Sequence, residues 1–274
     1  MKLQDLIKKT EQVFKENGLD DARVEAGYLA RFFFNYSAAQ LYLHLDEEVD
    51  EEPFMRQIVT RRLTGEPSAY ITGVQEFYGL PFKVNKNTLI PRPETELLVD
   101  KIIDLYETQE SLIVFDVGTG SGAIAITLAQ KLKKAQVRAL DISSLALEVA
   151  EENAVLNNVS NVNFLVSDLL ESISSQKADV IAANLPYVSY GQAQTDGFEP
   201  YNALYCGGDP LELIKKLAVQ LEYYLKDGGG VFLEVGIGQA QEVLNILHKN
   251  LSYVKDSGIE KDLAGIERLV WAQI

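Results

Sequence analysis

The chain has 274 residues, of which 47% are hydrophobic and 24% are charged, values typical of a globular protein with one or two domains. The single cysteine, Cys206, excludes an internal disulfide and fits a reducing cytoplasm, and we expect no bilayer-spanning segment. Two histidines far apart form no Cys/His zinc pattern, so no metal is expected. A net charge of −15 disfavours a nucleic-acid ligand, whose phosphates are usually neutralised by Lys and Arg.

The first 75 residues have a helical pattern. Asp20 and Asp21 can cap the second helix, and the acidic run 47–52 is expected to form a solvated turn. Because no strand pattern alternates with these helices, residues 1–75 are predicted to form a separate helical domain. Apolar residues recur at helical spacing in four segments: 3–14, 22–33, 37–43 and 55–63.

Residues 96–274 are predicted to form the second domain, after a linker of residues 76–95 that contains a short hairpin at 77–84. Strand and helix patterns alternate here, which favours a parallel α/β sheet covered on both faces. The last two strands follow each other closely and are expected to pair antiparallel. The predicted strands are 112–117, 137–140, 162–166, 178–183, 231–235, 253–259 and 268–273, and the helices begin near residues 97, 123, 143, 210 and 239.

A glycine-rich loop joins the first of these strands to a helix. Gly118, Gly120 and Gly122 follow the apolar run 112–117, and glycines at such a turn allow positive φ and close approach of a ligand. The helix that follows points free N–H groups at that ligand. The spacing differs from the dinucleotide pattern G-x-G-x-x-G, which disfavours a nicotinamide oxidoreductase. Asp116 suits a cation such as the ammonium and sulfonium of S-adenosylmethionine, so we predict a methyl-donor site.

Polar residues end the next three strands, where open α/β sheets bind ligands. Asp141, after the second strand, is placed to bond ribose hydroxyls, and Asp168, after the third, is placed near an adenine edge. The predicted cofactor-binding residues are Asp116, Gly118, Thr119, Gly120, Ser121, Gly122, Asp141, Ile142, Asp168, Leu169 and Asn184.

The fourth strand ends in Asn184-Leu185-Pro186-Tyr187. The side-chain oxygen of Asn184 and the carbonyl of Leu185 can each accept one N–H of an –NH₂ group and so orient its nitrogen. Pro186 stiffens the turn, and Tyr187 offers a face for stacking. A glutamine amide and an adenine amino group present the same geometry to this turn, so the motif alone leaves both open. A module that binds the methyl donor without turnover is a further alternative.

Together, these motifs resemble the peptide-chain-release-factor glutamine N5-methyltransferases, the HemK/PrmC family. The resemblance rests on 69–73 (Ala-Tyr-Ile-Thr-Gly), 76–79 (Glu-Phe-Tyr-Gly), 89–96 (Leu-Ile-Pro-Arg-Pro-Glu-Thr-Glu), 116–122, 141–143, 184–187, 199–200, 233–236 (Leu-Glu-Val-Gly) and 261–265. The family usually has Asn-Pro-Pro-Tyr, whereas this chain has Leu185 at the second position. Asn-Leu-Pro-Tyr also occurs in ribosomal-RNA adenine dimethyltransferases. A backbone carbonyl persists with either residue, and we expect only the backbone of Leu185 to be used.

The resemblance implies a seven-stranded Rossmann-like class I methyltransferase sheet with a helical N-terminal substrate-recognition domain. It implies that S-adenosylmethionine methylates the N5 amide nitrogen of the Gly-Gly-Gln glutamine of a class I release factor in the cytoplasm, leaving S-adenosylhomocysteine. N6 methylation of adenine in RNA or DNA is the alternative. The implied catalytic residues are Asn184, Leu185, Pro186 and Tyr187, and Arg92 and Glu199 join them in substrate binding.

Overall fold

The computed structural model describes residues 1–188, 197–205 and 207–274. Cys206, the single cysteine of the chain, lies outside the described residues. The chain divides into two compact units, Met1–Gly73 and Val74–Ile274, and the hairpin belongs to the second. Among the described helices, none combines the length and the apolar character needed to cross a membrane.

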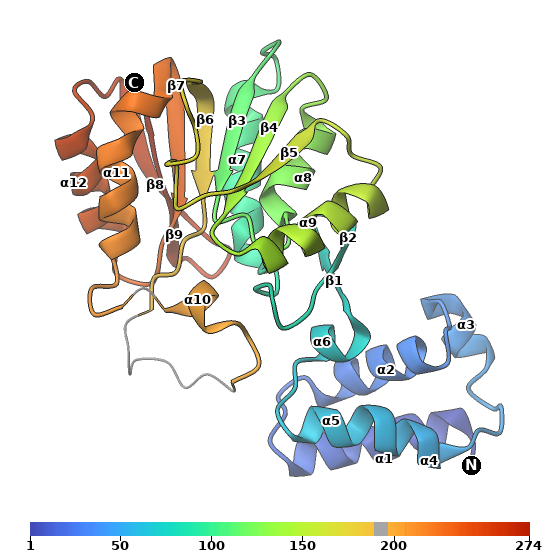
Figure 1. Ribbon diagram of the computed structural model, residues 1–274. Helices are drawn as coiled ribbons and strands as arrows, with labels where there is room; N and C mark the ends of the chain where they lie inside the picture. Colours follow the sequence, from blue (N-terminus) through green and yellow to red (C-terminus); the bar gives the residue numbers. More distant parts are fainter. Residues whose placement is uncertain (189–196, 206) are drawn as a thin grey trace. The chain divides into compact units, whose positions relative to one another are not determined.

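The first unit is helical (Figure 1). Its core gathers buried residues from several helices, among them Phe14, Leu29 and Phe54. The helices are α1 (Leu3–Glu16), α2 (Ala22–Phe33), α3 (Ala38–Leu43), α4 (Glu51–Phe54), α5 (Thr60–Leu63) and α6 (Ser68–Thr72), with a π-helical turn, η1 (Met55–Val59), between α4 and α5.

The helix termini of this unit differ from the prediction in two places. Asp21 makes no side-chain cap at the start of α2, whereas Ser37 and Gln40 form a reciprocal capping box at α3. The acidic run ends in a helix instead of continuing as a turn, because Asp50 accepts a hydrogen bond from the Glu52 amide and α4 begins at Glu51.

The second unit is built on a seven-stranded sheet with the order β5-β4-β3-β6-β7-β9-β8. The strands β3 to β7 are parallel, and β9 runs antiparallel to both of its neighbours, so the predicted antiparallel pair is confirmed. The strands are β3 (Ile113–Val117), β4 (Gln136–Asp141), β5 (Val162–Val166), β6 (Ala178–Ala183), β7 (Leu225–Glu234), β8 (Asp256–Lys261) and β9 (Glu267–Gln273).

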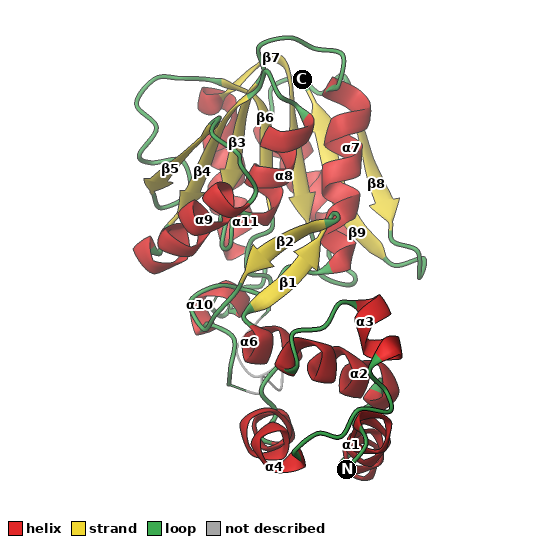
Figure 2. Cartoon of the chain, turned by 90° about the vertical axis from the view of Figure 1, so that its right-hand side faces the viewer, coloured by secondary structure: helices red, strands yellow, loops and turns green. Residues whose placement is uncertain are grey.

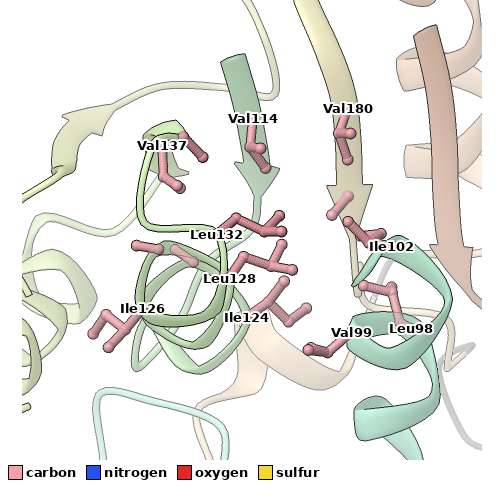
Figure 3. Packing of buried hydrophobic residues seen from close by; sticks show 14 of the residues in the cluster. Leu98, Val99, Ile102, Val114, Ile124, Ile126, Leu128, Leu132, Val137 and Val180 are labelled. Atoms are coloured by element: carbon pink, nitrogen blue, oxygen red, sulfur yellow. The ribbon is translucent and has the colours of Figure 1, made fainter. Parts of the chain in front are cut away.

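Helices cover both faces of this sheet. Alternation along β3 sends Val114 to the core beneath α7 and α8 and Phe115 to the core beneath α11 and α12. Figure 3 shows the first of these cores, with Leu98 and Ile102 of α7 facing Leu128 of α8. The helices are α7 (Glu96–Tyr106), α8 (Ala123–Lys131), α9 (Ser144–Leu156), α10 (Tyr201–Leu204), α11 (Glu212–Tyr224) and α12 (Ala240–Asn250), and a 3₁₀ turn, η2 (Pro93–Thr95), precedes α7.

The hairpin of β1 (Val74–Phe77) and β2 (Leu80–Lys83) is a separate two-stranded ribbon in the second unit (Figure 2). Tyr78 and Gly79 both have positive φ, as a type I′ turn requires. Glu96, in the first turn of α7, accepts a hydrogen bond from the Tyr78 amide at 2.7 Å. The buried Asn153 of α9 bonds the backbone of Lys83 and the Ser121 carbonyl, which ties the hairpin to the glycine loop.

Candidate active site

A cavity of about 690 Å³ opens at the carboxyl ends of the parallel strands. Parallel strands deliver their carboxyl-terminal loops to one edge of a sheet, so residues distant in sequence converge there. Of the predicted site residues, those that line the cavity are Gly118, Gly120, Asp141, Ile142, Asp168, Leu169, Asn184, Leu185 and Pro186. Thr119, Ser121 and Gly122 complete the loop without lining it.

The glycine loop is fixed by its backbone and by close packing. Gly118, Gly120 and Gly122 have φ of 76°, 56° and 83°, the left-handed region that favours glycine. The Leu140 carbonyl at the end of β4 accepts hydrogen bonds from the amides of Gly118 and Thr119. A Cβ on Gly118 would lie 3.1 Å from Leu185 Cδ2, so the loop rests directly on the turn that follows β6.

Asp116 lies beneath this loop and does not line the cavity. Its Oδ2 accepts hydrogen bonds from Thr119 Oγ1 at 2.6 Å and the Ala125 amide at 3.0 Å, and its buried Oδ1 has no partner among the described residues. Burial raises the pKa of Asp116 to about 7, against the lowering effect of these two hydrogen bonds. The carboxyl group therefore bonds the loop and the start of α8 through Oδ2 alone.

Asp141 links the loop to the end of β4. Its Oδ2 accepts from the Gly120 amide at 2.8 Å and its Oδ1 from the Ser143 amide at 2.9 Å, while Ser143 itself caps α9. Burial raises the pKa of Asp141, and the backbone hydrogen bonds oppose that shift. Each carboxylate oxygen keeps a lone pair for a hydroxyl donor.

Two further predicted cofactor-binding residues, Asp168 and Leu169, follow β5. Asp168 is exposed, and Leu169 is buried with a φ of 49°, an uncommon conformation for a residue with a Cβ. Both line the cavity beside Ser167. Leu169 thus lies at the edge of the cavity and also belongs to the buried core beneath α11 and α12.

The turn Asn184-Leu185-Pro186-Tyr187 follows β6, directly beside the glycine loop. Tyr187, expected to offer a face for stacking, is half-buried and does not line the cavity, and a Cβ on Gly236 would lie 2.9 Å from its ring. Gln239 donates to the Tyr187 carbonyl at 3.1 Å and accepts from the Gly236 amide at 2.8 Å. Leu185, of which only the backbone was expected to matter, is 4% exposed, and its side chain packs in the core beneath α11 and α12.

The structure brings Arg92 and Glu199 together, although neither lines the cavity. Arg92 donates to Glu199 Oε2 at 2.5 Å, and Glu199 Oε1 accepts from the Ile90 amide at 3.1 Å. The segments next to the pair do reach the cavity, since residues 86–89, which precede Arg92, and residues 200–203, which follow Glu199, line it. These two predicted substrate residues therefore connect two walls of the site.

Sequence reasoning missed two buried polar residues beside Asn184. Thr95 and Glu234 are 5% and 4% exposed, Thr95 Oγ1 donates to Glu234 Oε2 at 2.6 Å, and Asn184 Nδ2 donates to Thr95 Oγ1 at 3.2 Å. Burial raises the pKa of Glu234 to about 7. A signal was present, because Glu234 interrupts the apolar run 231–235 and both residues stand in stretches that carry the family resemblance.

Comparison with known proteins defines the family. The PrmC N-terminal domain family matches residues 5–73. A release factor glutamine methyltransferase of Koribacter versatilis is 39% identical over 256 residues, which cover 90% of each chain. Another, of Neisseria gonorrhoeae, is 40% identical over 257 residues, covering 90% of this chain and 92% of that protein. The chain belongs to the release factor glutamine methyltransferase family.

A second family match covers only part of the second unit. The ribosomal protein L11 methyltransferase (PrmA) family matches residues 93–186. A solved ribosomal protein L11 methylase of Lactobacillus delbrueckii is 26% identical with a TM-score of 0.50, over 66% of this chain and 80% of that one. The likeness confirms the class I methyltransferase fold predicted for the second unit, a fold that serves different substrates.

Proposed function

We propose that this chain transfers a methyl group from S-adenosylmethionine to the N5 amide nitrogen of the Gly-Gly-Gln glutamine in a class I peptide chain release factor. The observation that carries the proposal is the contact between two turns: a Cβ on Gly118 would lie 3.8 Å from the Asn184 carbonyl oxygen and 3.1 Å from the Leu185 side chain. The donor loop and the acceptor turn are thus adjacent on neighbouring strands. Such a substrate would place the enzyme in the cytoplasm with the translation machinery.

The residues present suit the methyl donor. A Cβ at Gly118 would crowd Leu185 Cδ2 at 3.1 Å, Asp141 offers carboxylate acceptors for a ribose, and Asp168 and Leu169 border the same cavity. Asp116 Oδ1 adds a buried carboxyl oxygen below the loop that has no hydrogen-bond partner among the described residues. When bound, S-adenosylmethionine supplies an electrophilic methyl group on a positively charged sulfur.

The protein's task is to aim a weak nucleophile, because the lone pair of an amide nitrogen is delocalised into its carbonyl. Asn184 Oδ1 and the Leu185 carbonyl would accept the two N–H bonds, which turns the nitrogen toward the methyl group and raises its electron density. The nitrogen lone pair then forms the N–C bond, the C–S bond breaks toward sulfur, and the methylated nitrogen loses its extra proton to water. Positioning of this kind can lower a barrier by about 7–11 kcal/mol at most.

Methyl transfer to a purified class I release factor, to its Gln→Ala variant and to RNA, side by side with radiolabelled donor, tests the proposal. We expect one methyl group on the Gly-Gly-Gln glutamine, located by mass spectrometry. Equal labelling of the Gln→Ala variant would contradict the proposal, and labelling of RNA alone would favour adenine N6 methylation, with a steep dependence on salt.

For the first unit we propose docking of the release factor. Its support is that Met1–Gly73 has a core of its own and is the part matched by the PrmC N-terminal domain family. A chain of residues 74–274 should bind the donor with full affinity and methylate a short Gly-Gly-Gln peptide, yet fail on intact release factor. Full-rate methylation of the intact factor by the shortened chain would refute docking.

A further inference from the structure

Three side chains from separate segments form a hydrogen-bonded row next to the cavity, and two of them, Thr95 and Glu234, are buried. Ala183 of β6 is in register with Leu233 of β7, so Asn184 and Glu234 leave the ends of adjacent parallel strands at the same level. Thr95, in the turn before α7, lies between them and bonds both: it donates to Glu234 Oε2 at 2.6 Å and accepts from Asn184 Nδ2 at 3.2 Å. Only Asn184 of the three lines the cavity.

The direction of this row is set by the carboxylate. An ionised carboxylate only accepts hydrogen bonds, so the Thr95 hydroxyl must give its one proton to Glu234. The Thr95 oxygen is then left as an acceptor, and the side chain of Asn184 must turn its –NH₂ end toward it. We propose that Thr95 and Glu234 are positioning residues that fix the side-chain amide of Asn184 with Oδ1 toward the acceptor amide, an inference that rests on the proposed function.

The fixed direction matters because a side-chain amide is nearly symmetric in shape. If Asn184 were rotated by half a turn, it would present N–H donors to the N–H donors of glutamine, and the buried polar groups would be left unpaired. The row therefore makes the site prefer a substrate group that donates hydrogen bonds, such as the –NH₂ group of a glutamine amide. Thr95 is held in place by η2, which is part of the 89–96 stretch, and this assigns a purpose to a threonine between two glutamates.

Charged groups from several elements surround Glu234. Burial raises its pKa to about 7, and its hydrogen bond from Thr95, the positive charge of Arg268 on β9 and Asn184 oppose that shift, whereas Glu94 in η2 adds to it. Tyr187 also faces the carboxyl group, and burial followed by the charge of Glu234 raises its own pKa. Arg268 donates to Asp262 of the 261–265 stretch, and Asp262 also accepts hydrogen bonds from the amides of Ala264 and Ile266. A protonated carboxyl group could donate to Thr95, so the direction of the row is lost at low pH.

The test measures kcat on purified release factor, and donor affinity by calorimetry, for the full chain, three single variants and the double variant Thr95→Val with Glu234→Gln. Thr95→Val removes the hydroxyl at nearly constant shape, Thr95→Ser keeps it, and Glu234→Gln replaces the acceptor-only group. We expect Thr95→Val and Glu234→Gln each to lower kcat by about 10- to 100-fold with donor affinity within about twofold. Thr95→Ser should stay within about threefold of the unchanged chain, and the double variant should be no slower than the worse single one.

The pH profile separates positioning from a structural role. For the unchanged chain, kcat should rise as the pH passes about 7, the pKa of Glu234. In Glu234→Gln, this rise of kcat with pH should be absent. Thr95→Val with an unchanged kcat and pH profile would overturn the inference. If Glu234→Gln fails to fold, the comparison of Thr95→Val with Thr95→Ser decides the question. A full chain that leaves the release factor unmethylated would instead overturn the proposed function, and this inference with it.

Discussion

Arg92 and Glu199 form an ion pair at 2.5 Å although they stand 107 positions apart in the chain. The pair joins the segment before η2 to the segment before α10, and both segments continue into the cavity wall. The carboxylate is well shielded, since the Glu199 side chain is 10% exposed and that of Arg92 is 42% exposed. This shielding makes the pair stronger than a fully exposed one, which contributes about 0.2–1 kcal/mol.

Loss of this pair should loosen the acceptor side of the site. Glu199→Gln keeps an oxygen for the Ile90 amide but removes the charge, so we expect the KM for release factor to rise by about three- to tenfold. Donor affinity, measured by calorimetry, should change by less than about twofold. Glu152→Gln, which breaks the exposed pair with Lys83, is the matched control and should leave both values unchanged. An equal effect of the two variants would argue against the connection.

Two glycines of the same loop should fail in different ways when changed to alanine. A Cβ on Gly122 would lie 3.1 Å from Ala150 Cβ and 2.8 Å from Ile126 Cδ1, so Gly122→Ala should lower the free energy of unfolding by about 1–3 kcal/mol. A Cβ on Gly120 meets nothing within 4 Å, and Gly120 lines the cavity. Gly120→Ala should therefore weaken donor binding at least about tenfold, with only about 1–2 kcal/mol of backbone strain. Urea titration and calorimetry separate the two; intact donor binding in Gly120→Ala would contradict this account.

The acceptor turn allows a test of side chain against backbone. Asn184→Ala should keep the fold and donor affinity and lower turnover by orders of magnitude. Leu185→Pro keeps the carbonyl, so activity should stay within about tenfold, or about 1.4 kcal/mol. Because the Leu185 side chain packs in the core and against Gly118, the same change should lower the free energy of unfolding by about 1–3 kcal/mol. Unchanged stability would mean that the packing of Leu185 contributes nothing.

Asp116 should make stability depend on pH in a defined direction. Its pKa is about 7 in the folded chain against an ordinary value of 3.8, so the folded state holds a proton that the unfolded state has released. Stability should therefore fall as the pH rises from about 4 to about 7 and then level off. Glu234 acts in the same direction, so Asp116→Asn should reduce the slope without abolishing it. Urea unfolding at pH 5 and pH 8 measures the slope, and a slope that stays the same in Asp116→Asn would contradict this assignment.

Much of the fold was predictable because periodicity survives in the sequence. The strands 162–166 and 178–183 were predicted with the bounds that the structure has, since each is an apolar segment bordered by polar residues. The short helices α6 and α10 were missed because four or five residues carry too little pattern to identify. The π-helical turn η1 inside the helix predicted at 55–63 has no pattern of its own either.

The site was predictable where a residue ends a strand and unpredictable where it depends on tertiary contact. Asp141 and Asn184 follow strands, so their place at one edge of the sheet follows from topology. The burial of Asp116, the packing of Tyr187 on Gly236 and the row through Thr95 arise from elements far apart in the chain. No local pattern encodes such contacts.

The register of β3 with β6 sets the level of the glycine loop relative to the turn that begins at Asn184. Val117 is in register with Ala183, so the donor loop starts level with the acceptor turn, on strands that lie about 4.8 Å apart. A slip of one residue would displace Asn184 along the strand by about 3.3 Å, more than the tolerance of a methyl transfer in line with the leaving sulfur. The spacing between the glycine loop and the turn that begins at Asn184 is therefore set by backbone hydrogen bonds of the sheet, which side-chain substitutions change little.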